Sequence, residues 1–167
     1  TKSNPSSPFI TKTLLGSAST VFGWKTKKTT AVAQALFQQG HITYIRCDNP
    51  VISVDGQKML KAYNKKSFPA NYVASKLPDY NNKKAKLEHE CIRPTDLDNQ
   101  PKFMAGSDEG KLYDLIRRRF IASGLTAAQY DSVSIDVNIN GHPFRAQGST
   151  QTFDGYLKVW HFTKRND

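Results

Sequence analysis

The spacing of the apolar residues changes once along this chain, close to residue 126, and that change restricts the fold more than any other feature. Before it, apolar residues recur at helical spacing, whereas residues 131–140 alternate strictly between apolar and polar side chains. Asn140-Gly141 then gives the strongest short signal for a β-hairpin turn, with the return strand expected over about 144–150. A third strand is expected near 156–162. The pattern therefore predicts an α+β chain, with helices first and antiparallel strands after them.

Three helices are expected before that change. The clearest covers residues 108–123, where an apolar stripe recurs at helical spacing and Ser107 can cap the start. Two others are expected over about 29–39 and 54–64, the second capped by Ser53. The remaining segments are interpreted as a tether (1–8), a short strand or the entry to a helix (9–15), a strand-like run (41–46) and a loop with one helical turn (65–86).

These elements divide the chain into three parts. Residues 1–17 are expected to form an N-terminal tether and connector strand, and residues 18–125 a mainly helical domain. Residues 126–167 are expected to form the hairpin and a further strand. The sequence thus predicts a helical domain flanked by antiparallel strands.

The charge is distributed unevenly between the two halves of the chain. The 167 residues include 24 Lys and Arg and 14 Asp and Glu, a net charge of +10. Residues 1–86 hold 14 of the basic and 3 of the acidic residues, whereas residues 87–167 hold 10 and 11. An excess of this kind favours a polyanionic partner, nucleic acid before a membrane. No apolar run approaches the roughly 18 residues that span a bilayer, and two cysteines make no disulfide framework, so a reducing, cytoplasmic setting is expected.

Residues 40–50, Gly-His-Ile-Thr-Tyr-Ile-Arg-Cys-Asp-Asn-Pro, place a phenol close to a guanidinium. In an extended segment Tyr44 and Arg46 project to the same side, because side chains two apart share a face. A phenol oxygen can attack a phosphodiester while an arginine holds the phosphate oxygens. From these two residues alone, a packed tyrosine and a solvated arginine remain the ordinary interpretation.

Several segments, in order from about residue 8 to 160, resemble bacterial type IA DNA topoisomerases. Residues 40–50 are similar to the family's active-tyrosine pattern I-T-Y-M-R-T-D-S, and residues 89–95 to its H-E-A-I-R-P-T. Ile45 favours the topoisomerase I branch, since the topoisomerase III branch usually has proline there. Further matches are residues 8–14 to P-F-T-T-S-T-L, residues 27–37 to K-K-T…A-Q-x-L-Y, and residues 112–116 and 153–159 to later segments of the family.

The resemblance implies a role for each matched residue. Tyr44 is the expected nucleophile, which forms a 5′-phosphotyrosyl link and frees a 3′-hydroxyl. Arg46 is expected to position or stabilise the scissile phosphate, and His89 to position or protonate groups on the cleaved strand. The supporting residues are Thr43, Asp48 and Arg93, and the role of Arg93 is left open between DNA contact and structure. Contacts to the DNA backbone are expected from Lys25, Lys27 and Lys28.

The resemblance also implies what surrounds these residues. In this family the tyrosine domain is mainly helical and winged-helix-like and is joined to the rest by strands of a connecting arch. The whole enzyme relaxes negatively supercoiled DNA. Its Mg²⁺ is held by an acidic Toprim domain, for which this sequence shows no matching acidic cluster. We therefore expect no metal or cofactor on this chain itself, and no cleavage by the chain alone. The expected partners are single-stranded DNA and the remaining topoisomerase domains, without a membrane and near the nucleoid.

Departures from the family leave some points open. The family's Thr-Asp-Ser is Cys47-Asp48-Asn49 here, and its A-Q-E-A before the histidine is Ala-Lys-Leu-Glu at 85–88. Cys47 and Cys91 are interpreted as ordinary thiols, with the alternative that their modification blocks DNA binding. Two other functions remain: a non-catalytic, basic, winged-helix-like module in which Tyr44 stacks on a base, and a relaxase-like nicking enzyme. The second needs a metal-binding histidine cluster, which the four histidines do not form.

Overall fold

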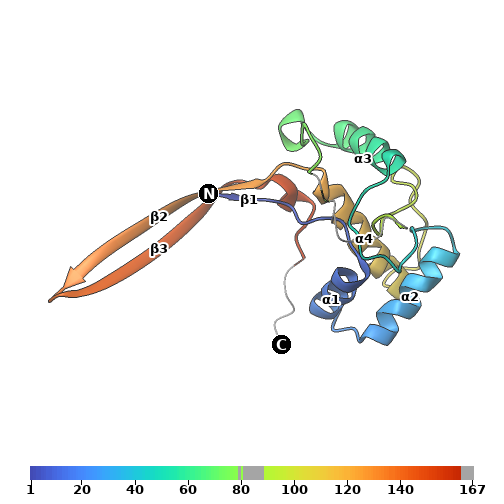
Figure 1. Ribbon diagram of the computed structural model, residues 1–167, viewed down its shortest axis with the longest axis horizontal. Coiled ribbons are helices and arrows are strands. Elements are labelled where there is room, and N and C mark those ends of the chain that lie inside the picture. Colours follow the sequence, from blue (N-terminus) through green and yellow to red (C-terminus); the bar gives the residue numbers. More distant parts are fainter. Residues whose placement is uncertain (79, 81–88, 163–167) are drawn as a thin grey trace.

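The computed structural model describes residues 1–78, 80 and 89–162. Within these residues the chain is α+β, as predicted, with four α-helices and a three-stranded antiparallel sheet. Figure 1 shows the helices gathered in one body, from which the β2–β3 hairpin projects. The elements are β1 (Lys2–Ser3), α1 (Thr11–Phe22), α2 (Thr26–Gln38), α3 (Val54–Ser67), the 3-10 helix η1 (Ala70–Tyr72), α4 (Asp108–Ser123), β2 (Ala128–Ile139), β3 (His142–Phe153) and the 3-10 helix η2 (Gly155–Lys158).

The helices carry the sequence signals that predicted them. α4 has the predicted bounds, and the Ser107 hydroxyl accepts the Gly110 N–H at 3.2 Å. α2 begins three residues before the predicted start, and α3 continues three residues beyond its predicted end. η1 is the single helical turn predicted within residues 65–86, of which residues 79 and 81–86 lie outside the described part of the chain.

The structure decides one local expectation that the sequence left open and contradicts two others. Residues 9–15, left open between strand and helix, lead into α1. The strand expected over 41–46 is wrong, because only Ile42 forms an isolated bridge, to Pro94. The strand expected near 156–162 is wrong as well: Gly155 turns the chain at φ +50°, and η2 follows. The third strand of the sheet is β1, within the segment expected to be a tether, and it pairs with the start of β2.

Helix α4 lies at the centre of the body and contributes to two apolar clusters (Figure 1). One cluster joins it to α1 and α2, and the other joins it to α3. The predicted stripe is fully buried, since each of its side chains is 0% exposed. At about 1.5–3 kcal/mol for each large apolar side chain, this stripe is a main source of stability. Its members are Leu112, Leu115, Ile116 and Phe120.

The hairpin has the predicted turn and alternation but an uncovered apolar face. Asn140 and Gly141 both have positive φ, at +52° and +83°, as a tight two-residue hairpin turn requires. Val137 pairs with Phe144, and on the opposite face Arg145 forms an ion pair with Asp136 at 2.6 Å. The apolar face is 46–62% exposed at Val133, Ile135, Val137, Ile139 and Phe144. Among the described helices, none combines the length and hydropathy that crossing a bilayer requires.

Candidate active site around Tyr44

Tyr44 lies in the irregular segment between α2 and α3, against the last turn of α2. Gly40, at φ +77°, turns the chain back after that helix, and the His41 N–H donates to the carbonyl of Leu36 at 3.0 Å. The Tyr44 ring then packs edge-on against Phe37, with ring centroids 5.3 Å apart. The side chain is half-buried, so the protein holds the ring while part of it stays accessible.

The residues after Tyr44 are held by the first turn of α1. The Thr11 hydroxyl donates to the carbonyl of Ile45 at 2.7 Å and accepts the Cys47 N–H at 2.9 Å. The Thr11 N–H donates to the carbonyl of Cys47 at 3.0 Å. These bonds replace the strand pairing that the sequence predicted, and they fix the backbone on both sides of Arg46.

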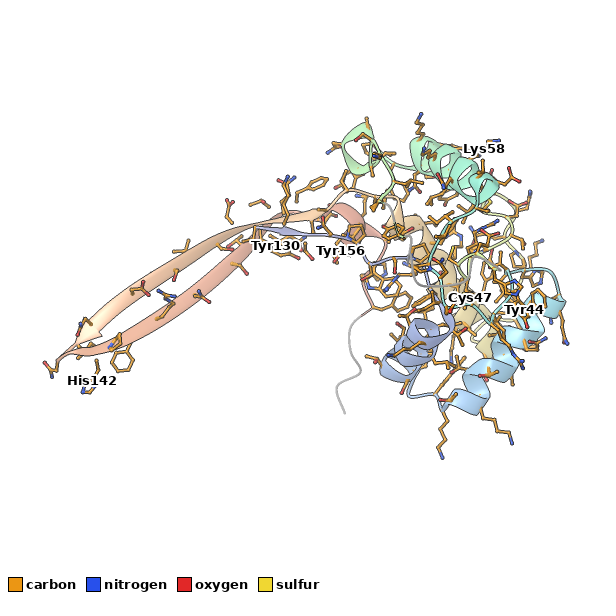
Figure 2. All side chains as sticks on the ribbon, viewed as in Figure 1. Tyr44, Cys47, Lys58, Tyr130, His142 and Tyr156 are labelled. Atoms are coloured by element: carbon orange, nitrogen blue, oxygen red, sulfur yellow. The ribbon has the colours of Figure 1, made fainter. Side chains whose placement is uncertain are left out.

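His89 contacts the Tyr44 ring and also lines a cavity together with Arg46. Its ring centroid is 4.7 Å from that of Tyr44. The exposed side chains of His89, Arg46 and Asp48 line one open cavity of about 650 Å³, together with Cys47 and the start of α1. Figure 2 shows Tyr44 and Cys47 close together on the helical body. The fold thus gathers Tyr44, Arg46 and His89, although more than 40 residues separate Arg46 from His89.

A buried ion pair supports the backbone that carries His89. Arg93 is 8% exposed and donates from Nε and Nη2 to the two carboxylate oxygens of Glu90, each at 2.8 Å. Its Nη1 donates to the carbonyl of Pro94 at 2.9 Å, and the Ser53 N–H donates to Glu90 Oε2 at 3.1 Å. Burial raises the pKa of the Glu90 carboxyl, but the bonds from Arg93 and Ser53 outweigh it and hold that pKa below its usual value.

The sequence analysis did not single out Glu90. The structure places Glu90 in the ion pair with Arg93. The available signal was the spacing of three between two opposite charges in the His-Glu-x-Ile-Arg segment. Arg93 was left open between DNA contact and structure, and its geometry is that of an internal support, because Glu90, Ser53 and Pro94 engage its guanidinium.

Thr43 joins the tyrosine segment to the same support. Its hydroxyl donates to the carbonyl of Cys91 at 2.8 Å and accepts the Arg93 N–H at 3.0 Å. Its own N–H donates to the carbonyl of Arg93 at 2.9 Å. Thr43 therefore sets the distance between the segment that carries Tyr44 and the segment that carries His89.

The lysine cluster lies at the other end of α2 from Tyr44. Lys28 is engaged within the protein, with Nζ 2.9 Å from the Asp108 carboxylate and 4.5 Å from the Trp24 ring centroid. Lys25 and Lys27 are exposed. Ten residues of helix separate Lys27 from Phe37, which corresponds to about 15 Å. The fold does not bring this cluster into the Tyr44 site. The separation equals about four steps along duplex DNA, at about 3.4 Å each.

The two cysteines are both buried and free. Burial raises the pKa of the Cys47 thiol and of the Cys91 thiol above the usual value. Since the thiolate is the reactive form, the structure gives neither cysteine the environment of a reactive thiol.

The type IA resemblance implies Mg²⁺, which needs a set of oxygen ligands. In residues 1–78, 80 and 89–162, no group of three or more His, Cys, Asp or Glu side chains is arranged to hold a metal ion. Mg²⁺ takes oxygen ligands in octahedral geometry, and Asp48 is the one carboxylate among the residues that line the cavity. These residues do not fit a magnesium site.

The fold and the site agree with one class of protein. The DNA topoisomerase family matches residues 1–167, and the chain belongs to that family. Within it, the chain resembles the bacterial enzyme DNA topoisomerase 1. It is 39% identical to the Pasteurella multocida protein over 169 residues, covering 99% of this chain and 20% of that protein. It is 37% identical to the Escherichia coli K12 protein over 170 residues, covering 100% and 20%.

A solved structure extends the likeness from sequence to fold. The full-length topoisomerase I of Thermotoga maritima aligns with a TM-score of 0.80 and 32% sequence identity, over 99% of this chain and 28% of that chain. The present chain therefore spans about a fifth of the length of the curated relatives named above.

Proposed function

We propose that this chain supplies the nucleophile of a bacterial type IA DNA topoisomerase, and that Tyr44 is that nucleophile. The proposal rests on the contact between the rings of Tyr44 and His89, whose centroids are 4.7 Å apart. His89 in turn lines the same cavity as Arg46. These residues come from segments far apart in the sequence. They match the family's patterns at the positions of its tyrosine, arginine and histidine.

In the proposed reaction the phenol oxygen of Tyr44 attacks the phosphorus of a DNA phosphodiester. The bond from phosphorus to the 3′ oxygen breaks, the phosphate becomes joined to Tyr44 and to the 5′ oxygen, and the phenol proton leaves. The departing 3′ oxygen takes up a proton and becomes a hydroxyl. Because one phosphodiester replaces another, the reverse attack restores the strand without ATP.

Arg46 and His89 have separate tasks in this reaction. The guanidinium of Arg46 can donate two parallel hydrogen bonds to the non-bridging phosphate oxygens, where negative charge grows during attack. His89 lies beside the Tyr44 ring and can hold the strand or deliver the proton to the leaving 3′ oxygen. Thr43, Glu90 and Arg93 act through the backbone and are positioning residues. Asp48 lies on the cavity wall as a supporting residue.

The proposed setting is a larger enzyme, in which relaxation of negatively supercoiled DNA needs parts beyond these residues. The type IA resemblance implies an acidic Toprim domain that supplies Mg²⁺, and we expect the chain alone not to cleave DNA. The exposed apolar face of the hairpin supports packing of residues 126–167 against other domains, as strands of the connecting arch. Residues 1–17 are the proposed connector and residues 18–125 the tyrosine-bearing domain, and the enzyme is expected in the cytoplasm with the nucleoid.

Single-stranded DNA is the proposed substrate at the cleavage point. Lys25 and Lys27 are exposed about 15 Å along α2 from the Tyr44 contact, where they can hold the backbone several nucleotides away. Lys28 can contribute after exchanging Asp108 for a phosphate.

A second function is favoured by the aromatic surroundings of Tyr44. Phe37 and His89 lie against the Tyr44 ring, and such a cluster can stack on a base without any covalent step. The test uses a hybrid enzyme, in which this chain replaces the matching segment of the E. coli protein. In the hybrid, Tyr44→Phe is expected to abolish the covalent DNA adduct while leaving affinity for single-stranded DNA nearly unchanged.

The matched control is Tyr130→Phe, which removes a hydroxyl at the base of the hairpin, away from Tyr44 (Figure 2). This variant is expected to form the adduct as the unaltered hybrid does. An adduct that persists in Tyr44→Phe contradicts the nucleophile assignment. An unaltered hybrid that binds single-stranded DNA but forms no adduct favours the stacking module.

A further inference from the structure

The cavity beside Arg46 has a second cation in its lining. Lys12 is an exposed residue in the first turn of α1, and its side chain lines the cavity together with Arg46. The backbone brings the two residues together: Thr11, just before Lys12, donates its N–H to the carbonyl of Cys47, just after Arg46, at 3.0 Å. The two long side chains therefore start from neighbouring points on the rim of one cavity.

Lys12 contributes a positive charge to the lining of this cavity. The charged residues of the lining are Lys12, Arg46 and Asp48. Arg46 and Asp48 carry opposite charges, and Lys12 adds a further positive charge to the lining. Within the described residues no ion pair joins Lys12 or Arg46 to a carboxylate. Among the described residues, neither cation thus has a carboxylate partner that an incoming anion would have to displace.

This charge departs from the family pattern quoted in the sequence analysis. The type IA pattern P-F-T-T-S-T-L has serine at the position where this sequence has Lys12. A serine there would remove this positive charge from the lining. The apolar part of the wall, Ile10 and Leu15, offers no competing polar group.

We propose that Lys12 binds a backbone phosphate of single-stranded DNA together with Arg46, in the cavity beside Tyr44. Arg46 presents a planar fork of donors and Lys12 a compact ammonium charge, so the two can share one phosphate or hold two successive phosphates. Repulsion from Asp48 directs the phosphate toward the two cations. The inference rests on the proposed function, because it takes DNA as the ligand.

The test measures binding without cleavage, by fluorescence anisotropy of a labelled oligothymidylate with this chain over a range of salt concentrations. Loss of one phosphate contact lowers the slope of log affinity against log salt by about 0.7 for single strands. At about 0.1 M salt that slope change corresponds to about a fivefold loss of affinity. We expect this loss in Lys12→Ser and recovery of wild-type affinity in Lys12→Arg.

The matched control is Lys58→Ser on α3, which Figure 2 shows across the helical body from α1. This variant removes the same charge away from the cavity and is expected to leave affinity and slope nearly unchanged. Equal losses in Lys12→Ser and Lys58→Ser would mean that only net charge matters, and would overturn the proposal while leaving the proposed function intact. Absence of oligothymidylate binding by the wild-type chain would overturn both.

Discussion

The ion pair between Glu90 and Arg93 allows a quantitative test of how the site is supported. The change is Glu90→Gln, which keeps the shape of the side chain but removes its charge. Arg93 is 8% exposed and donates two bonds of 2.8 Å to Glu90, and the glutamine oxygen can accept one of them. Removing one partner of a buried pair costs about 3–5 kcal/mol. Because the Glu90 side chain is 24% exposed, we expect a cost somewhat below this range, about 2–3 kcal/mol.

The lowered pKa of Glu90 also predicts how the effect of Glu90→Gln on stability changes with pH. The folded-state pKa of Glu90 lies below its usual value of 4.5, so the pair stabilises the fold above that pH. This stability is lost as the pH falls through the lowered folded-state pKa, because the protonated carboxyl no longer compensates Arg93. The difference between wild type and Glu90→Gln should therefore be largest near neutral pH and shrink in acid.

Thermal unfolding followed by far-UV circular dichroism measures this difference. A loss of about 2–3 kcal/mol corresponds to a Tm lower by about 5–10 °C in a chain of this size. The control is Asp55→Asn, whose partner Lys58 is 3.9 Å away with both side chains largely exposed, and no measurable change is expected. An unchanged Tm in Glu90→Gln, or a difference that persists undiminished in acid, would refute the reasoning.

Four further predictions concern packing, thiol chemistry and activity. Gly56→Ala should lower stability by about 1–3 kcal/mol in chemical unfolding, because a Cβ there would lie 2.7 Å from Arg93 Nε. Gly16→Ala, which meets nothing within 4 Å in the middle of α1, should instead stabilise the fold by about 0.5–1 kcal/mol. Cys47 and Cys91 should be alkylated slowly by iodoacetamide in the native chain and rapidly after unfolding, and fast native alkylation would contradict their burial. The chain alone, with Mg²⁺, should leave a supercoiled plasmid unrelaxed; relaxation would contradict the need for further domains.

Elements with strong local signals could be predicted from the sequence. α4 has an apolar stripe, a capping serine and acidic residues in its first turn, and its predicted bounds are confirmed. The hairpin turn at Asn140-Gly141 is confirmed for the same kind of reason, since few residues accept positive φ in succession. These signals depend on neighbours in the sequence and not on the rest of the fold.

Elements that depend on distant partners could not be predicted. The strand expected over 41–46 fails because hydrogen bonds to Thr11 and to residues 91–95 hold this segment in place of a neighbouring strand. β1 has two residues and pairs with β2 across more than 120 positions, and nothing local marks it as a strand. The charge of Lys28 likewise looked available to DNA, but its partner Asp108 belongs to another helix.

The candidate site likewise contains residues that the sequence predicts and others that only the structure reveals. Tyr44, Arg46 and His89 were found from motifs, and the fold brings them together, while their roles stay predictions. Glu90 was missed because its burial depends on Arg93 and Ser53, which meet it only in the folded chain. The identity of a reactive group can therefore be read from a sequence pattern, whereas the groups that hold it in place require the structure.

The most direct test of the central claim is to identify the residue that becomes linked to DNA. The hybrid enzyme is incubated with Mg²⁺ and a single-stranded oligonucleotide, denatured during turnover and digested, and the DNA-linked peptide is sequenced by mass spectrometry. The account predicts a 5′-phosphate on the oxygen of Tyr44 and a free 3′-hydroxyl on the released strand. A link to any other residue, or to the 3′ end of the broken strand, would contradict it.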